Sequence, residues 1–319
     1  MVIFKRIFWV LVTVSLSGGL FYSAYHSQDI IDWWRLRDYK PSANIVQLSK
    51  NASFSDLGQK LFYVHDPALL DKAQFAQSCT VGEETIVLGC YITHQRIFVF
   101  DVDDERLSGA EEVTAAHEML HAAYDRLSPD RSKEIDELLI DTFNSLDDPG
   151  LKRVVESYRD RDPSVVPNEL HSILGTEVRD LPKLLEEHYA QYFADRSVVV
   201  GLAENYSDEF ERREAEIGVL DKQLESLKSE IARIESDLTL QASALTRDRK
   251  TLESLVGTDP QEYNRRIPAF NSRINKYNSD VAKAGKLVDR HNEIVKARNT
   301  IALEEKELVE AIDTRVEEL

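Results

Sequence analysis

The 319-residue chain is poor in basic residues, glycine, proline and cysteine. Its 39 lysines and arginines are outnumbered by 57 aspartates and glutamates, so the formal net charge is −18. We therefore expect no nucleic-acid partner, because phosphate binding needs a basic face. The 12 glycines and 9 prolines interrupt the chain rarely, which favours helices. The length allows one globular domain plus an extended part.

Long runs without charged residues are also scarce. One uncharged run of 19 residues extends from residue 7 to residue 25, and Lys5 and Arg6 precede it. Such a run can cross a bilayer as a helix, and its basic flank places the N-terminus in the cytoplasm. A cleaved signal peptide is the alternative, but no small-x-small cleavage site follows the run. We expect residues 1–28 to be a transmembrane signal anchor in a cell membrane. Most of the chain would then be extracytoplasmic, with Trp33 and Trp34 close to the membrane surface.

The two cysteines, Cys79 and Cys90, flank a stretch that reads as two short strands around a turn. An exported chain meets oxidising conditions, so the pattern predicts one disulfide that closes this hairpin. Two buried free thiols are the alternative. A metal site built on these cysteines would need further ligands.

Residues 114–123 contain the pattern His-Glu-x-x-His, with His117, Glu118 and His121. On a helix, residues four apart project from one face, so the two histidines can share a zinc ion. Glu118 beside them is suited to accept a proton from metal-bound water. The neighbouring residues are small or apolar, as a buried metal helix requires. Ser108 and Glu111 have the spacing of a capping box that would start this helix.

This motif resembles the active-site helix of zincin metallopeptidases. No third histidine follows His121 at the metzincin spacing, which leaves a gluzincin-like arrangement whose third ligand is a glutamate on a later helix. The resemblance covers about residues 60–200 and is specific only in the five-residue motif. It implies an α+β, zincin-like metallopeptidase domain over residues 29–202, with a small sheet and an active-site helix. It also implies Zn²⁺ as cofactor and metalloendopeptidase activity on a peptide or protein substrate.

Two apolar stretches before the motif, Ile86–Thr93 and Arg96–Val102, alternate as strands do. In zincin-like domains a strand just before the metal helix forms the edge of the sheet and pairs with extended substrate backbone. If Arg96–Val102 is that edge, the substrate is an extended peptide. The alternative is that Arg96–Val102 is a core strand, and the sequence leaves both open.

A further helix is expected from about Asn168, and it offers the third ligand. Glu169 and Glu177 are eight residues apart, which is about 80° around a helix axis, so both can face the metal. One would bind the metal and the other would support a ligand histidine. His171 is a third, less favoured candidate, and the sequence does not separate the two glutamates. On the next helix, His188 and Tyr189 are weaker candidates for contacting an oxyanion.

Residues 203–319 carry the 4-3 spacing of a coiled coil in two blocks. The first block is Leu220, Leu224, Leu227, Ile231, Ile234 and Leu238, and the second is Tyr263, Ile267, Phe270, Ile274, Tyr277, Val281, Ala284, Val288, His291 and Val295. Gly257 and Pro260 separate the blocks, which favours an antiparallel hairpin over dimerising parallel coils. This region would bind a protein partner or a second copy of the chain. The alternative function is therefore a non-catalytic envelope scaffold that acts through its coiled coil.

Overall fold

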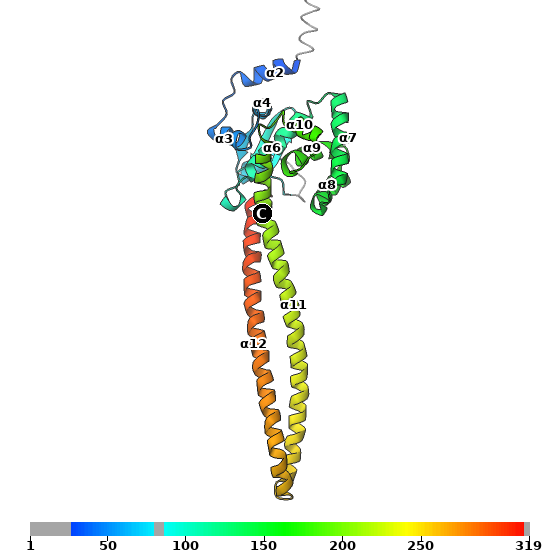
Figure 1. Ribbon diagram of the computed structural model, residues 1–319. Coiled ribbons are helices and arrows are strands. Elements are labelled where there is room, and N and C mark those ends of the chain that lie inside the picture. The colour runs from blue at the N-terminus through cyan, green and yellow to red at the C-terminus, as the bar shows by residue number, and fades with distance from the viewer. Residues whose placement is uncertain (1–26, 80–85, 316–319) are drawn as a thin grey trace, which may run out of the picture. The chain divides into compact units, whose positions relative to one another are not determined.

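The computed structural model describes residues 27–79 and 86–315 (Figure 1). The chain forms two compact units, one made of Met1–Ser207 with Ala311–Leu319 and the other of Asp208–Glu310. The apolar run at 7–25 lies outside the described residues. Among the helices that are described, none has the length and apolar character needed to cross a membrane.

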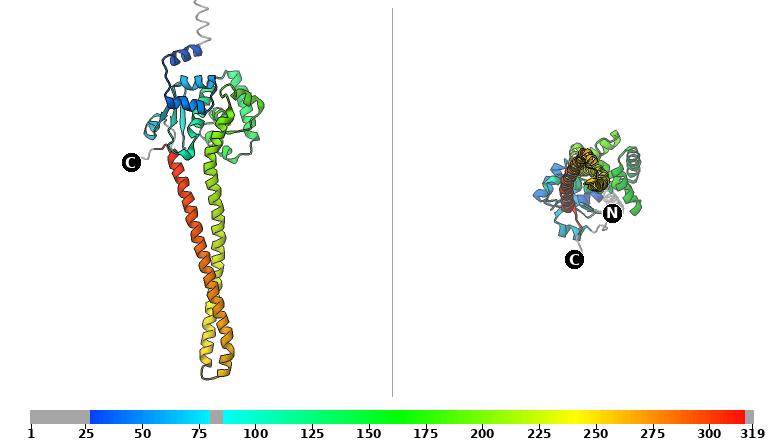
Figure 2. Two further views of the ribbon diagram at one scale, coloured as in Figure 1. Left: turned by 60° about the vertical axis from the view of Figure 1, so that its left-hand side comes forward. Right: turned by 90° about the horizontal axis from the view of Figure 1, so that it is seen from below.

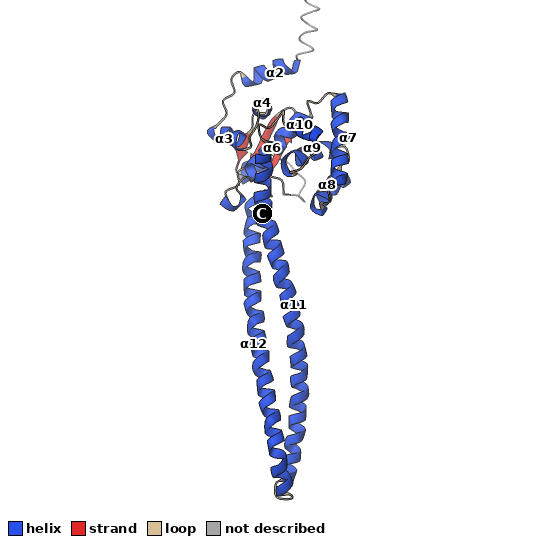
Figure 3. Cartoon of the chain, in the orientation of Figure 1, coloured by secondary structure: helices blue, strands red, loops and turns tan. Residues whose placement is uncertain are grey.

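The expected α+β class is wrong, because helices dominate the described residues and the sheet is very small (Figure 3). Short helices fill the stretches on both sides of the motif, and five of the described ones begin where a Ser or Asp side chain accepts a hydrogen bond from a free N–H of the first turn. These capped helices are α3 (Ala43–Asn51), α4 (Asp56–Val64), α5 (Lys72–Ser78), α7 (Pro129–Ser145) and α8 (Pro149–Arg161).

The sheet of the described residues has three strands in the order β1-β3-β2. The central strand β3 (Arg96–Phe100) pairs in parallel with β1 (Ala68–Leu70) and antiparallel with β2 (Gly89–Ile92). Four of its five residues are buried. Arg96–Val102, the candidate substrate-binding edge, therefore contains a core strand. Within the described ranges, β2 is an edge strand.

The motif helix α6 (Ala110–Tyr124) packs against β2, β3 and the helices α3, α4 and α9 (Val166–Glu177), most extensively α9. Alanines on α6 keep the packing distances short, and Ala115, Ala116 and Ala122 are fully buried. On the facing helix, a Cβ at Gly175 would lie 2.4 Å from Cδ1 of Leu120, so only glycine allows this approach. The unit continues through α10 (Lys183–Tyr189) into the start of α11.

The start of α6 differs from the expected capping box. Gly109 is the N-cap, in the left-handed region with φ 101°, and no side chain caps the helix there. Ser108 instead ends a short 3-10 turn, η1 (Glu105–Leu107). Glu111 uses its carboxylate to accept a hydrogen bond of 2.9 Å from the N–H of Val102, just after β3. The cap was mispredicted because glycine, like serine, can begin a helix.

Cys79 and Cys90 form the predicted disulfide, and residues 80–85 of the expected hairpin lie outside the described residues. Cys79 follows the last turn of α5 and Cys90 lies within β2, so the bond ties a helix to a strand. The strand partner of β2 is β3, across a turn at residues 93–95.

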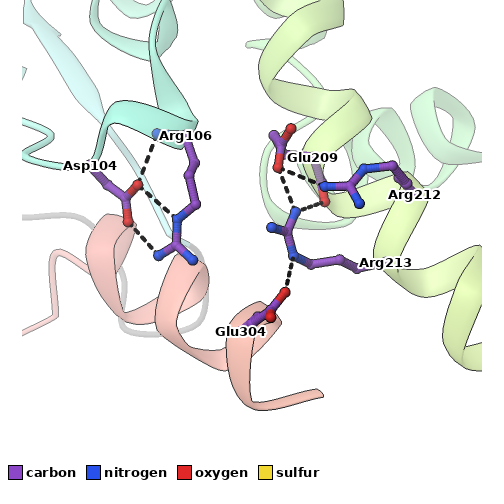
Figure 4. A network of polar contacts seen from close by, with 6 residues as sticks. All are labelled: Asp104, Arg106, Glu209, Arg212, Arg213 and Glu304. Carbon is purple, nitrogen blue, oxygen red and sulfur yellow. Dashed lines mark hydrogen bonds and ion pairs between the residues drawn. The ribbon is translucent and has the colours of Figure 1, made fainter. Parts of the chain in front are cut away.

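Two long helices, α11 (Arg196–Leu255) and α12 (Pro260–Ile312), run antiparallel and contain the second unit (Figures 1 and 2). Hydrogen-bonded side-chain pairs between α11 and α12 fix the register of the two helices. Among them are Gln241 with Asp280 at 2.7 Å and Arg298 with Asp221 at 2.8 Å. Another network joins Arg213 to Glu209 on its own helix and to Glu304 on α12 (Figure 4).

The antiparallel hairpin is confirmed, but two of the predicted seam positions of α12 are wrong. Val281 and Val288, which the spacing placed on the seam, are 44% and 40% exposed. Ala284 and Leu287 are more protected from solvent in that stretch.

Candidate metal centre

The two motif histidines and one of the two candidate glutamates meet in space. One ligand atom from each of His117, His121 and Glu169 lies within 4.8 Å of the others. Oε2 of Glu169 is 3.7 Å from Nε2 of His117 and 3.8 Å from Nε2 of His121. These separations exceed a hydrogen bond. They are close to the roughly 3.3 Å expected between ligand atoms that share one tetrahedral zinc ion. The three residues therefore form a group that can hold a metal ion.

Two polar neighbours orient these groups. Nδ1 of His121 is 2.9 Å from Oδ1 of Asn168, an amide oxygen that can only accept. His121 therefore carries its proton on Nδ1 and presents the lone pair of Nε2 towards the group. The hydroxyl of Tyr158, on α8, faces the carboxylate of Glu169 and favours its ionised form. Asn168 and Tyr158 had not been identified from the sequence, although Asn168 directly precedes a candidate ligand.

Glu118 is 6% exposed and lies against strand β2. The backbone N–H of Tyr91 faces the carboxylate of Glu118 and favours its ionised form. Two residues earlier on the same strand, a Cβ at Gly89 would lie 2.8 Å from both Cγ and Oε1 of Glu118. Glycine at this position lets the strand approach α6 closely enough to contact the acidic side chain. Cys90, between these two strand residues, anchors β2 to α5 through the disulfide.

Burial and neighbouring charges shift the pKa values of the side chains at the candidate metal centre. Burial raises the pKa of Glu118 to about 7, and the carboxylate of Glu169 adds to this effect. Burial, with the positive charge of His117, lowers the pKa of His121 to about 4. Burial opposes ionisation of Glu169, but the neighbouring histidines and Tyr158 outweigh it, and its pKa lies below the usual value. At neutral pH His121 is thus a neutral imidazole and Glu169 a carboxylate, the forms that bind metal. Burial lowers the pKa of His117, but the carboxylates of Glu169 and Glu118 outweigh burial and raise it, so this ring must lose its proton when metal binds.

The other candidate ligands lie outside the group. Glu177, at the last position of α9, is exposed. His171 is fully buried, and its Nε2 is 2.8 Å from Nε2 of His188. The hydroxyl of Tyr189 donates to the backbone carbonyl oxygen of His171 at 2.8 Å. His171, His188 and Tyr189 therefore belong to a buried aromatic cluster and are not part of the metal-binding group.

Comparisons with known proteins found no matching protein-family model, no matching curated protein and no matching solved structure. Any assignment of function must therefore come from the site itself.

Proposed function

We propose that the chain is a zinc-dependent metallopeptidase, anchored in a cell membrane, with most of its length extracytoplasmic. The observation that carries this proposal is the grouping of His117, His121 and Glu169 beside the buried carboxylate of Glu118. Two imidazoles and one carboxylate suit zinc, and three protein ligands leave a fourth position open, as catalytic zinc sites require. The same donor set supports the resemblance to gluzincins at the level of the site.

Zinc bound here would polarise a peptide carbonyl and make a bound water acidic. Glu118 then has the role of general base, and a carboxyl group with a pKa near 7 can both take a proton and return it to the leaving amine. The N–H of Tyr91 holds the carboxylate in place, and Asn168 fixes the ring of His121. Tyr158 does the same for the third ligand, Glu169.

Strand β2 favours a peptide or protein as the substrate. It is an edge strand of the described sheet and its backbone contacts Glu118. Extended peptides bind edge strands through main-chain hydrogen bonds, which tolerate many side chains. A non-protein amide, such as a peptide cross-link of a cell wall, would use the same chemistry at the metal.

The test is zinc content and hydrolysis measured together on the full chain. We expect one zinc per chain in the wild type and in Glu118→Gln and Glu177→Ala, and none in His117→Ala or Glu169→Ala. Glu118→Gln should lose hydrolysis in a peptide-library assay while keeping the metal. Zinc-free wild type that is well folded would refute the metal site. Full activity in Glu118→Gln would refute the mechanism.

A scaffold function remains the second candidate, and the length of the hairpin favours it, because α11 and α12 have 60 and 53 residues. The described part of the hairpin contains no group of side chains suited to metal binding. Under this alternative, deleting the hairpin would abolish the cellular role while Glu118→Gln would be harmless. The opposite pattern would support the peptidase.

A further inference from the structure

Helix α2 (Ser27–Leu36) presents a large apolar face to solvent. Ile30 and Ile31 are each 46% exposed, and Trp33 and Trp34 are 62% and 66% exposed. At 100° per residue these four side chains span an arc of roughly 160° around the helix. Exposing adjacent tryptophans and isoleucines to water costs free energy, so we expect another surface to cover this face.

The opposite face of α2 is fixed to its own unit. Asp32 lies about 180° from the centre of the apolar arc and is 1% exposed. Arg126, just beyond the end of α6, donates two hydrogen bonds to its carboxylate, at 2.7 and 3.0 Å. Lys60 on α4 adds a contact of 3.3 Å. The apolar face therefore points outward because a buried ion pair holds the other side.

The sequence before α2 indicates what covers this face. The uncharged run at residues 7–25 ends two positions before the helix begins. Two residues span at most about 7 Å, so a helix that follows a membrane-spanning segment this closely cannot leave the interface. Tryptophan is enriched at that depth. Residues 27–40 carry three acidic and three basic side chains, so attraction to anionic lipid contributes little.

We propose that α2 lies on the outer surface of the bilayer, with Ile30, Ile31, Trp33 and Trp34 inserted among the lipid head groups. This inference rests on the proposed N-terminal anchor. The contact also concerns the candidate metal centre, because α2 is joined to two of its elements. Arg126 follows α6, and Arg35 donates a hydrogen bond of 2.7 Å to the carbonyl oxygen of His94, in the β2–β3 turn.

The test uses the full chain with Trp9→Phe, which leaves Trp33 and Trp34 as its only tryptophans. The protein is placed in nanodiscs of phosphatidylcholine, with and without bromine on the upper acyl carbons. We expect bromine to quench the tryptophan emission about twofold, and aqueous iodide to have little effect. For a matched control, Trp33 and Trp34 are also changed to Phe and Val154→Trp is added on α8. Figure 1 shows α8 at the end of the unit away from α2, and Val154 is 45% exposed.

The outcomes separate the anchor from the docking of α2. Emission of the control should respond to iodide and not to bromine. If the chain does not enter nanodiscs at all, the anchor is refuted and the docking proposal falls with it. If it enters and its α2 tryptophans respond to iodide but not to bromine, the docking is refuted and the anchor stands. Protection from both quenchers would mean that a second copy or another protein covers this face, and would equally refute the proposal.

Discussion

Replacing Gly89 by alanine tests whether β2 must approach α6 closely to position Glu118. An added Cβ would lie 2.5 Å from Cγ2 of Thr114 and 2.8 Å from Cγ and Oε1 of Glu118. Ordinary contact begins at 3.4 Å, so strand and helix would have to separate by about 0.6 to 0.9 Å. The backbone N–H of Tyr91 would move away from the carboxylate of Glu118 with the strand.

Two measurable effects follow. Overpacking of this kind lowers the free energy of unfolding by about 1 to 3 kcal/mol, measured by urea denaturation. A displacement approaching 1 Å in the catalytic carboxylate should lower the rate of peptide hydrolysis by about 10²-fold. Zinc content should remain at the wild-type level, because the substituted strand supplies none of the ligands His117, His121 and Glu169.

Gly218→Ala, in α11, is the control, because a Cβ there meets nothing within 4 Å. It should raise stability by about 0.5 to 1 kcal/mol and leave hydrolysis unchanged. Wild-type stability and wild-type activity in Gly89→Ala would refute the reasoning. Loss of zinc from that variant would show instead that β2 shapes the ligand group itself.

Three further predictions concern the neighbourhood of the site. Asn168→Ala removes the partner of His121 and should weaken zinc binding by about 10- to 100-fold in a chelator competition; unchanged affinity would contradict that role. Burial raises the pKa of Glu111 from 4.5 to about 7, so the folded state holds this proton more tightly, and stability declines as pH rises from about 4.5 through 7. Glu111→Gln cannot ionise, so urea denaturation should find it more stable than wild type at pH 8 and equal at pH 4; a difference independent of pH would contradict this. Changing Cys79 and Cys90 together to serine should cost about 3 kcal/mol, and reductant should then destabilise the wild type but not the variant.

Local patterns in the chain predicted several features correctly. His117 and His121 share a face because a helix repeats every 3.6 residues, whatever packs around it. The repeat of apolar residues predicted two long antiparallel helices. That repeat failed at Val281 and Val288, because nearby apolar residues, including Leu287, can occupy the seam equally well.

The dominance of helix around the motif was not foreseen, because a resemblance in five residues carries no information about the stretches around it. Residues 129–161 form two capped helices, α7 and α8, and the second brings Tyr158 to Glu169. The serine and aspartate caps were visible in the sequence. Their contact with the metal-binding group was not, because it depends on how separate helices pack.

The sequence by itself determined that His117 and His121 lie on one face of a helix, that Cys79 pairs with Cys90 and that two long helices run antiparallel. Each of these features depends on spacing along a short stretch or on there being only two cysteines. Only the tertiary structure decided between Glu169 and Glu177. Both can face the metal by angle, but eight residues separate them by about 12 Å along the axis, so one helix cannot bring both to the same point. The packing of α9 against α6 places Glu169 with His117 and His121. The edge position of β2 was likewise decided there, because β1, far back along the chain, pairs with the other side of β3 (Ala68 opposite Phe98) and leaves β2 at the edge of the described sheet.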